Sequence, residues 1–157
     1  MTISLQGKVV KTETAQRPGM THLLLVEDDD RFRTMLALAL SRRGFRVTQA
    51  CDGSRALDFL VQIALRGNRE QIPQLLVTDY RLPGFCGLGL IEAARIARMN
   101  IPAILITAFG DADIRERAAL VGATPVLEKP FALDELLTLI RRVAGLGTPL
   151  QCLSGDA

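Results

Sequence analysis

Short apolar runs alternate along the chain with longer segments in which apolar residues recur every three or four positions. The runs Leu23–Val26, Leu75–Thr78 and Ala103–Ile106 are almost continuously apolar. Runs of this length without alternation are typical of strands that are covered on both faces. Phe45–Thr48 and Val126–Leu127 are shorter runs of the same kind, so the pattern predicts five strands.

A helical pattern follows each of these runs. The segment 133–143 is the most amphipathic, because its apolar residues all fall on one helical face. Gly44, Gly67 and Gly122 stand where three of the helices should end. The apolar or terminal positions that mark the five predicted helices are Phe32, Leu36, Ala39 and Leu40; Ala56, Leu57, Leu60 and Ala64; Leu88, Ile91, Ala94 and Arg98; Ile114, Ala118 and Val121; and Leu133, Leu136, Leu137, Ile140 and Val143.

Five strand–helix units predict an α/β fold with a doubly wound, five-stranded parallel sheet. Strands that are apolar throughout need helices on both faces of the sheet. In sheets of this kind, ligands bind beyond the carboxyl ends of the strands. The residues that directly follow each strand are therefore the candidates for a functional site.

Side chains suited to phosphoryl transfer stand at four of these strand ends. Glu27 and Asp28 follow the first strand, Asp79 the third, Thr107 the fourth and Lys129 the fifth. Clustered carboxylates repel one another, and a hard cation such as Mg²⁺ relieves that repulsion. A carboxylate can also act as a nucleophile, while a metal ion and a lysine neutralise the charge of a transferred phosphoryl group. The set predicts phosphoryl transfer to a carboxylate.

The residues around these positions form four motifs: Val26-Glu27-Asp28-Asp29, Asp79-Tyr80-Arg81-Leu82-Pro83-Gly84 with Gly87, Ile106-Thr107-Ala108, and Lys129-Pro130-Phe131. Together these motifs resemble the receiver domain of bacterial response regulators. Each motif alone is weak, but four in order, each at a strand end, are specific. The resemblance covers residues 21–144 and implies a flavodoxin-like sheet with strand order 2-1-3-4-5 and five helices.

The resemblance implies a role for each acid. Asp79 would accept a phosphoryl group from a phosphohistidine on a sensor histidine kinase or a phosphotransfer protein. Mg²⁺ would be bound by Glu27, Asp28 and Asp79 together with the backbone carbonyl of Arg81. The protein would then switch its contacts with other proteins and would catalyse only its own phosphorylation and dephosphorylation.

The resemblance also assigns the remaining strand-end residues. Thr107 and the backbone N–H of Ala108 would receive the phosphoryl oxygens, and Lys129 would pair with the phosphate. The peptide bond between Lys129 and Pro130 would be cis. The family usually has an aromatic residue where this chain has Val126. We therefore expect the switch to run through Thr107 and the following helix, without rotation of an aromatic ring.

Each of these residues has an ordinary structural interpretation when it is taken alone. Acids within Asp28–Asp30 could cap the first helix. Asp79 could be a turn residue, Thr107 a strand end and Lys129 a surface lysine. Their joint placement favours the functional interpretation. His22, by contrast, is expected to be structural or exposed.

Composition narrows the class of protein. The chain has 157 residues, 48% of them hydrophobic, and a net charge of +2 with no basic cluster, so direct nucleic-acid binding by this chain is not expected. No apolar run approaches the roughly 20 residues of a membrane span, no signal peptide is visible, and the three cysteines are irregularly spaced. We expect a cytoplasmic protein without membrane contact. Residues 1–20 are expected to form an N-terminal extension and 145–157 a flexible tail.

Two alternatives remain open, and two others lack the residues that they need. The chain could be the receiver fragment of a longer DNA-binding transcriptional regulator, or a degenerate receiver that acts unphosphorylated. A phosphohydrolase of the haloacid-dehalogenase kind would need an acid two residues after the nucleophile, where Arg81 stands. A nucleotide-binding protein would need a glycine-rich loop after the first strand, where the acids stand.

Overall fold

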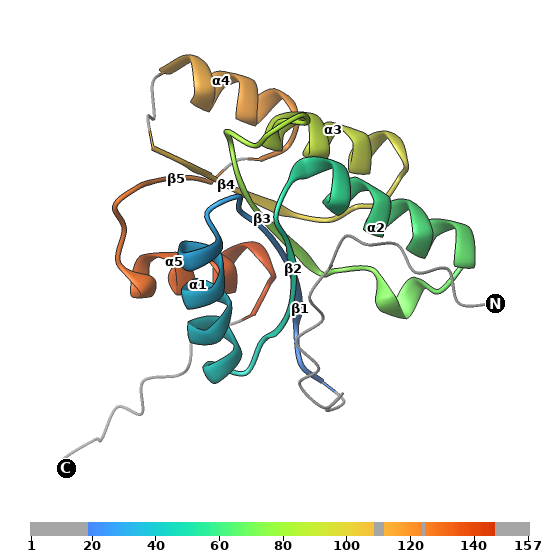
Figure 1. Cartoon of the computed structure of the whole chain (residues 1–157), viewed down its shortest axis with the longest axis horizontal. Coiled ribbons are helices and arrows are strands. Elements are labelled where there is room, and N and C mark those ends of the chain that lie inside the picture. The colour runs from blue at the N-terminus through green and yellow to red at the C-terminus, as the bar shows by residue number, and fades with distance from the viewer. Residues whose placement is uncertain (1–18, 109–111, 124, 147–157) are drawn as a thin grey trace, which may run out of the picture.

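The computed structural model of the chain describes residues 19–108, 112–123 and 125–146. Strands and helices alternate along the described chain (Figure 1). The predicted extension and tail lie almost entirely outside the described residues, so both remain predictions. The elements are β1 (His22–Val26), α1 (Asp30–Arg42), β2 (Arg46–Ala50), α2 (Gly53–Arg66), the 3-10 helix η1 (Arg69–Gln71), β3 (Leu75–Asp79), α3 (Gly87–Ile96), β4 (Ala103–Thr107), α4 (Ala112–Leu120), β5 (Val126–Glu128) and α5 (Leu133–Val143).

The five strands form one parallel sheet in the order β2-β1-β3-β4-β5. The predicted doubly wound α/β fold and its strand order are therefore confirmed. Because all the strands run in the same direction, their carboxyl ends meet at one edge of the sheet. In the register of β3 and β4, Asp79 lies opposite Ile106, which directly precedes Thr107. The topology thus brings the strand ends that the sequence singled out to one edge.

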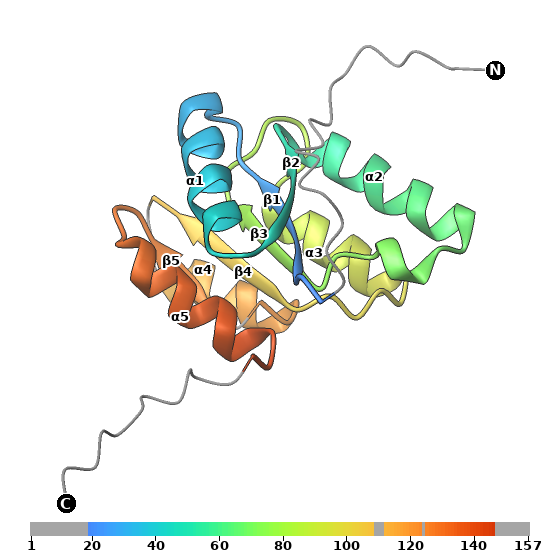
Figure 2. The same cartoon turned by 90° about the horizontal axis from the view of Figure 1, so that it is seen from below.

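Helices cover both faces of the sheet. Figures 1 and 2 show α1 and α5 together on one side, and α2, α3 and α4 on the other. Successive residues of a strand point to opposite faces, so each strand contributes to two cores. In β1, Leu23 and Leu25 pack with α1 and α5, whereas Leu24 packs on the opposite face with α2 and α3.

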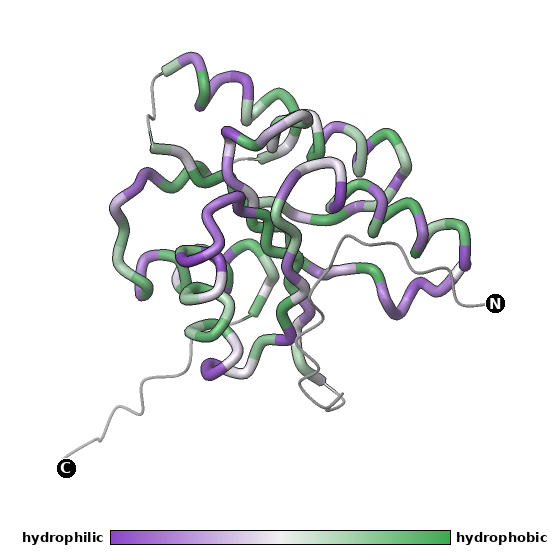
Figure 3. Tube along the Cα trace, in the orientation of Figure 1, coloured by the Kyte–Doolittle hydropathy of each residue, from purple (hydrophilic) through white to green (hydrophobic). Residues whose placement is uncertain are grey.

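The hydropathy of the chain follows this layering. In Figure 3 the strands at the centre of the molecule are largely hydrophobic. Leu23, Leu24, Leu76 and Leu105 are each at most 1% exposed, as strands covered on both faces require. None of the helices in the described part of the chain has the length and hydropathy needed to cross a membrane.

Three details of the sequence prediction were wrong. The second strand runs from Arg46 to Ala50, because Phe45 is still part of the turn and its N–H donates to the Leu40 carbonyl. Arg98 lies beyond α3: it has a φ of +56°, and the chain turns there so that Met99 N–H bonds back to Ala94. Ala64 faces solvent, and Ile63 occupies the buried position of that turn.

His22 is the first residue of β1 and is buried. Its side chain is 5% exposed, Nε2 lies 2.8 Å from Thr48 Oγ1, and the ring meets Phe59 edge-on at 6.4 Å. Burial and the neighbouring Arg46 charge lower the pKa of His22 from 6.5 to about 4 and outweigh the backbone of Gln71, which raises it. His22 is the only histidine of the chain and is held neutral in the core.

This burial predicts a pH dependence of stability. Between pH 6.5 and about 4, unfolded His22 binds a proton that folded His22 excludes. The free energy of unfolding should therefore fall as the pH falls through this window, by about 1.4 kcal/mol per pH unit at its steepest. Urea unfolding of the wild type and of His22→Gln, at several pH values, isolates this effect. Identical pH profiles for the two proteins would contradict it.

Candidate functional site

The predicted site residues lie at the carboxyl edge of the sheet and are fixed there by backbone hydrogen bonds between neighbouring strands. Glu27, just after β1, donates its N–H to the Ala50 carbonyl of β2 at 3.1 Å. Lys129, just after β5, donates its N–H to the Thr107 carbonyl of β4 at 2.8 Å. Asp79 is the last residue of β3. The positions of these side chains therefore follow directly from the sheet.

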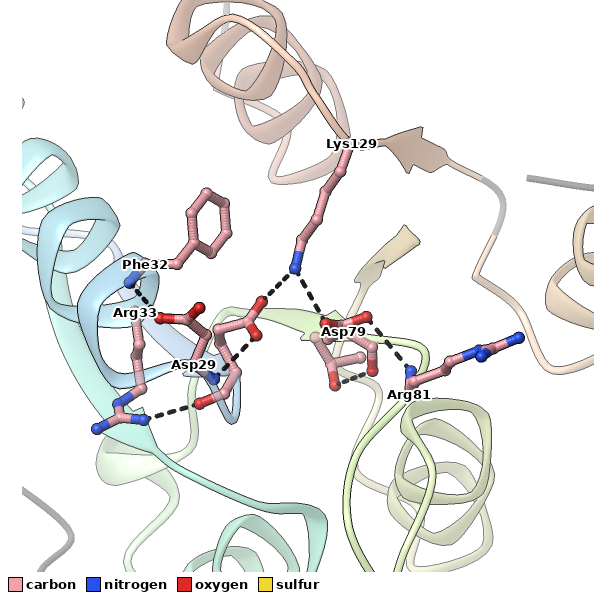
Figure 4. Close-up of polar contacts among 8 residues, drawn as sticks. Asp29, Phe32, Arg33, Asp79, Arg81 and Lys129 are labelled. Carbon is pink, nitrogen blue, oxygen red and sulfur yellow. Dashed lines mark hydrogen bonds and ion pairs between the residues drawn. The ribbon is translucent and has the colours of Figure 1, made fainter. Parts of the chain in front are cut away.

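Lys129 joins two buried carboxylates that are far apart in the sequence. Its Nζ donates to Glu27 Oε2 at 2.8 Å and to Asp79 Oδ2 at 3.0 Å (Figure 4). The side chains of Glu27 and Asp79 are 3% and 11% exposed. The other Asp79 oxygen, Oδ1, accepts the N–H of Arg81 at 3.3 Å. A single cation thus compensates two carboxylates that have little access to water.

The electrostatics of the pair follow from this arrangement. Burial raises the pKa of Glu27, and the nearby charge of Asp79 raises it further, against the opposing hydrogen bonds from Lys129 and the Asp29 N–H. Burial acts to lower the pKa of Lys129, but its hydrogen bonds to Glu27 and Asp79 outweigh burial and raise it. The lysine therefore stays charged beside the two buried carboxylates.

Asp28 completes a group of three acids that fits a hard divalent cation. One oxygen from each of Glu27, Asp28 and Asp79 lies within 4.8 Å of the others. Asp28 is exposed, whereas the other two carboxylates are buried. Carboxylate oxygens are the donors that Mg²⁺ prefers, and it needs only one or two of them besides waters. The donor set therefore matches the expected metal.

The remaining predicted residues lie nearby. Thr107 is the last residue of β4 and is 2% exposed, and Ala108 follows it with an exposed side chain. The peptide bond between Lys129 and Pro130 is cis. The Arg81 N–H bond to Asp79 brings the backbone of Arg81 to the acids.

The first turn of α1 supports the acids, and its role was only partly predicted. Asp29 caps the helix, since its Oδ1 accepts the Phe32 N–H at 2.9 Å. This bond is the main cause that lowers the pKa of Asp29. The sequence did not point to Arg33, which is 9% exposed and donates from Nη1 to the Glu27 carbonyl at 2.8 Å. Arg33 falls on the same helical face as the buried Leu36 and Leu40, and a charged residue on that face could have indicated its role.

The loop after β3 approaches the acids closely because two glycines leave room for it. A Cβ at Gly87 would lie 2.2 Å from the Asp79 carbonyl oxygen, and one at Gly53 would lie 2.0 Å from the Phe85 carbonyl oxygen. Cys86 caps α3, its exposed Sγ accepting the Gly89 N–H at 3.4 Å. Small residues at these points let α3 begin directly beneath Asp79.

Comparison with known proteins agrees with this geometry. The sequence pattern of the response regulator receiver domain matches residues 23–141. Sporulation initiation phosphotransferase F of Bacillus subtilis is 27% identical over 120 residues, which are 76% of this chain and 90% of that protein. A probable chemotaxis protein CheY of Rhizobium etli is 32% identical, over 78% of this chain and 92% of that protein.

Longer relatives and solved structures give the same result. The transcriptional activator PfeR of Pseudomonas aeruginosa is 41% identical, over 77% of this chain but only 38% of its own length. The chain likewise spans 25% of the C4-dicarboxylate transport transcriptional regulatory protein DctD of the same species. The receiver domain of the P. aeruginosa sensor histidine kinase PA1611, solved with magnesium in its active-site cleft, is 30% identical, with a TM-score of 0.66 over 80% of this chain and 98% of that one.

These matches disfavour the phosphohydrolase and nucleotide-binding alternatives, since the pattern that matches spans nearly all of the described residues. They also agree with the strand order and with the acids at its carboxyl edge. The chain belongs to the response regulator receiver domain family, whose members accept a phosphoryl group in two-component signalling.

Proposed function

We propose that Asp79 is the residue that accepts the phosphoryl group, from a phosphohistidine on a sensor histidine kinase or a phosphotransfer protein. The observation that carries this proposal is the Lys129 ammonium held between Glu27 and Asp79, at 2.8 Å and 3.0 Å. It leaves Asp79 as a buried carboxylate with a counter-charge beside it and further acids within ligand distance. Asp79 is thus a nucleophile with charge compensation at hand.

In the transfer step, an Asp79 carboxylate oxygen attacks phosphorus as the phosphorus–nitrogen bond of phosphohistidine breaks, and the leaving imidazole takes up a proton. Lys129 shifts from the carboxylates to a phosphoryl oxygen. The Thr107 hydroxyl and the Ala108 N–H bind the other oxygens. Hydrolysis later releases inorganic phosphate and restores the carboxylate. We assign the chain no chemistry beyond this phosphorylation and dephosphorylation.

Glu27, Asp28 and Asp79, with the backbone carbonyl of Arg81, would hold a Mg²⁺ ion, which supplies positive charge against the phosphoryl oxygens. Burial and the neighbouring charge of Asp79 raise the pKa of Glu27, and a divalent cation between the acids would offset both effects, which supports this assignment.

The output of the switch is proposed to run through α4. Position 126 is a valine, so it has no aromatic ring that could link Thr107 to the surface. Val126 is partly buried and packs against the core on the α4 side. Two contacts join α4 to the strand ends instead: Arg115 to Glu128 at 2.6 Å, and Arg117 Nη1 to the Tyr80 hydroxyl at 3.4 Å. A beryllofluoride complex in which α4 keeps its position relative to β4 and β5 would contradict this route.

Acetyl phosphate with and without Mg²⁺ tests the proposed function. Intact mass spectrometry should show a gain of one phosphoryl group with Mg²⁺ and no gain after chelation with EDTA. Labelling that is equally fast without a divalent ion would contradict the metal assignment. No labelling at any Mg²⁺ concentration would contradict the acceptor assignment and favour a receiver that acts unphosphorylated.

A further inference from the structure

Phe32, in the first turn of α1, lies against the lysine of the site. Lys129 Nζ is 4.6 Å from the centroid of the Phe32 ring, within the range of a cation–π interaction (Figure 4). The ring of Phe131 meets that of Phe32 edge-on, with centroids 6.0 Å apart and planes at 80°. The lysine therefore has an aromatic neighbour in addition to its two carboxylates.

Phe32 is connected to Glu27 in two ways, through Lys129 and through the Asp29 helix cap. Lys129 Nζ binds Glu27 Oε2 at 2.8 Å, and Glu27 Oε1 accepts the Asp29 N–H at 3.2 Å. Asp29 Oδ1 in turn accepts the Phe32 N–H at 2.9 Å, and the Phe32 ring contacts Lys129. The Asp29 cap thus holds the backbone of Phe32, and the Phe32 ring contacts Lys129. Glu27, which binds Lys129, also accepts the Asp29 N–H, so the three contacts support one another.

A ring suits this position for a physical reason. Lysine is a point charge on a flexible four-carbon stem, so holding it in one place has a large entropic cost. A further carboxylate would hold the ammonium but would also compete with an incoming phosphoryl oxygen for it. An aromatic face attracts the cation without accepting a directed hydrogen bond, so the ammonium can exchange its carboxylate partner for another oxygen while it stays over the ring.

We propose that Phe32 is a positioning residue, whose ring face holds the ammonium of Lys129 beside Glu27 and Asp79, with Phe131 bracing the ring. The inference rests on the proposed roles of Asp79 and Lys129 and adds a residue that acts through Lys129. Phe32→Leu keeps an apolar side chain of helical preference but removes the ring. Phe32→Tyr keeps the ring. Phe45→Leu removes a different aromatic ring, 6% exposed in the same core, and serves as a matched packing control.

The position of Lys129 can be observed without phosphorylation, because the chain contains only three lysines, Lys8, Lys11 and Lys129. In protein labelled with ¹³C-lysine, the ε-methylene signal of Lys129 is identified by its absence in Lys129→Arg. The ring current of Phe32 should shift the proton resonance of this signal upfield in the wild type. The shift should persist in Phe32→Tyr and Phe45→Leu and disappear in Phe32→Leu.

The rate of labelling by acetyl phosphate, at saturating Mg²⁺, tests the consequence. We expect Phe32→Leu to be labelled about fivefold more slowly than the wild type, with Phe32→Tyr and Phe45→Leu within about twofold of it. A wild-type rate in Phe32→Leu, or a Lys129 signal that Phe32→Leu leaves unmoved, would overturn the positioning role. If the wild type itself takes up no phosphoryl group, the proposed function fails, and the lysine signal still decides whether the Phe32 ring lies against Lys129.

Discussion

Replacing Asp79 with Asn is expected to abolish labelling by acetyl phosphate. The amide has nearly the same size and shape as the carboxylate, and its oxygen can still accept a hydrogen bond from Lys129. The substitution removes the anionic oxygen proposed to form the acyl phosphate and one of the three carboxylates in the acidic group. Because the altered atom is the proposed nucleophile, we expect complete loss of the phosphorylated species rather than a slower rate.

Asp52→Asn is a matched control for this change. Asp52 follows β2 and caps α2, its side chain accepting the Arg55 N–H at 2.8 Å. Asn caps helices about as well as Asp, so this variant loses the same charge with little effect on the fold. Intact mass spectrometry should find Asp52→Asn labelled like the wild type. Labelling of Asp79→Asn at a comparable level would show that another carboxylate is the acceptor.

Replacing Gly87 with Ala is expected to destabilise the fold and to disturb the site together. The new Cβ would lie 2.2 Å from the Asp79 carbonyl oxygen and 3.1 Å from Thr78 Oγ1. The nearest atom belongs to the backbone of a buried strand, so relief requires α3 or the end of β3 to move. We expect the free energy of unfolding to fall by about 3 kcal/mol. Labelling should slow by about 100-fold if Asp79 moves by an ångström.

Gly89→Ala makes the same change two residues further along α3. There the new Cβ would meet only ordinary contacts, at 3.4 Å from Phe85 and 3.5 Å from Cys86. Alanine is favoured over glycine within a helix by roughly 0.5–1 kcal/mol, so this variant should be slightly more stable than the wild type. Urea unfolding and labelling rates of both variants test the argument. Equal stability of the two would contradict it.

The layers of the fold could be predicted from the sequence because strands buried on both faces of a sheet appear as short, continuous apolar runs. Strands such as β3 are buried throughout and begin with a continuous apolar run, Leu75–Val77, and the helices between them carry one apolar face. The carboxyl edge then follows from parallel topology, which gathers the chemically distinctive strand-end residues without any knowledge of side-chain contacts. The polar residues that follow the strands in the sequence are therefore the ones that meet in the fold, so the candidate residues could be identified in advance.

Details that depend on tertiary packing could not be predicted in this way. Arg98 adopts a left-handed backbone conformation at a non-glycine position, which helical periodicity cannot reveal. The contact between Phe32 and Lys129 depends on how α1 is rotated about its axis and on where the segment after β5 passes. The burial of Arg33 and His22 likewise depends on partners 6 and 26 residues away. These features are set by packing between elements.

The most direct test of the account is to locate the phosphoryl group within the chain. Borohydride reduces an acyl phosphate of aspartate to homoserine, which marks the residue permanently. After treatment of the wild type with acetyl phosphate and Mg²⁺, trypsin should release the peptide from Glu70 to Arg81. The account predicts that tandem mass spectrometry finds homoserine at position 79 of this peptide and only when Mg²⁺ was present. Reduction at any other carboxylate, with Asp79 unchanged, would contradict it.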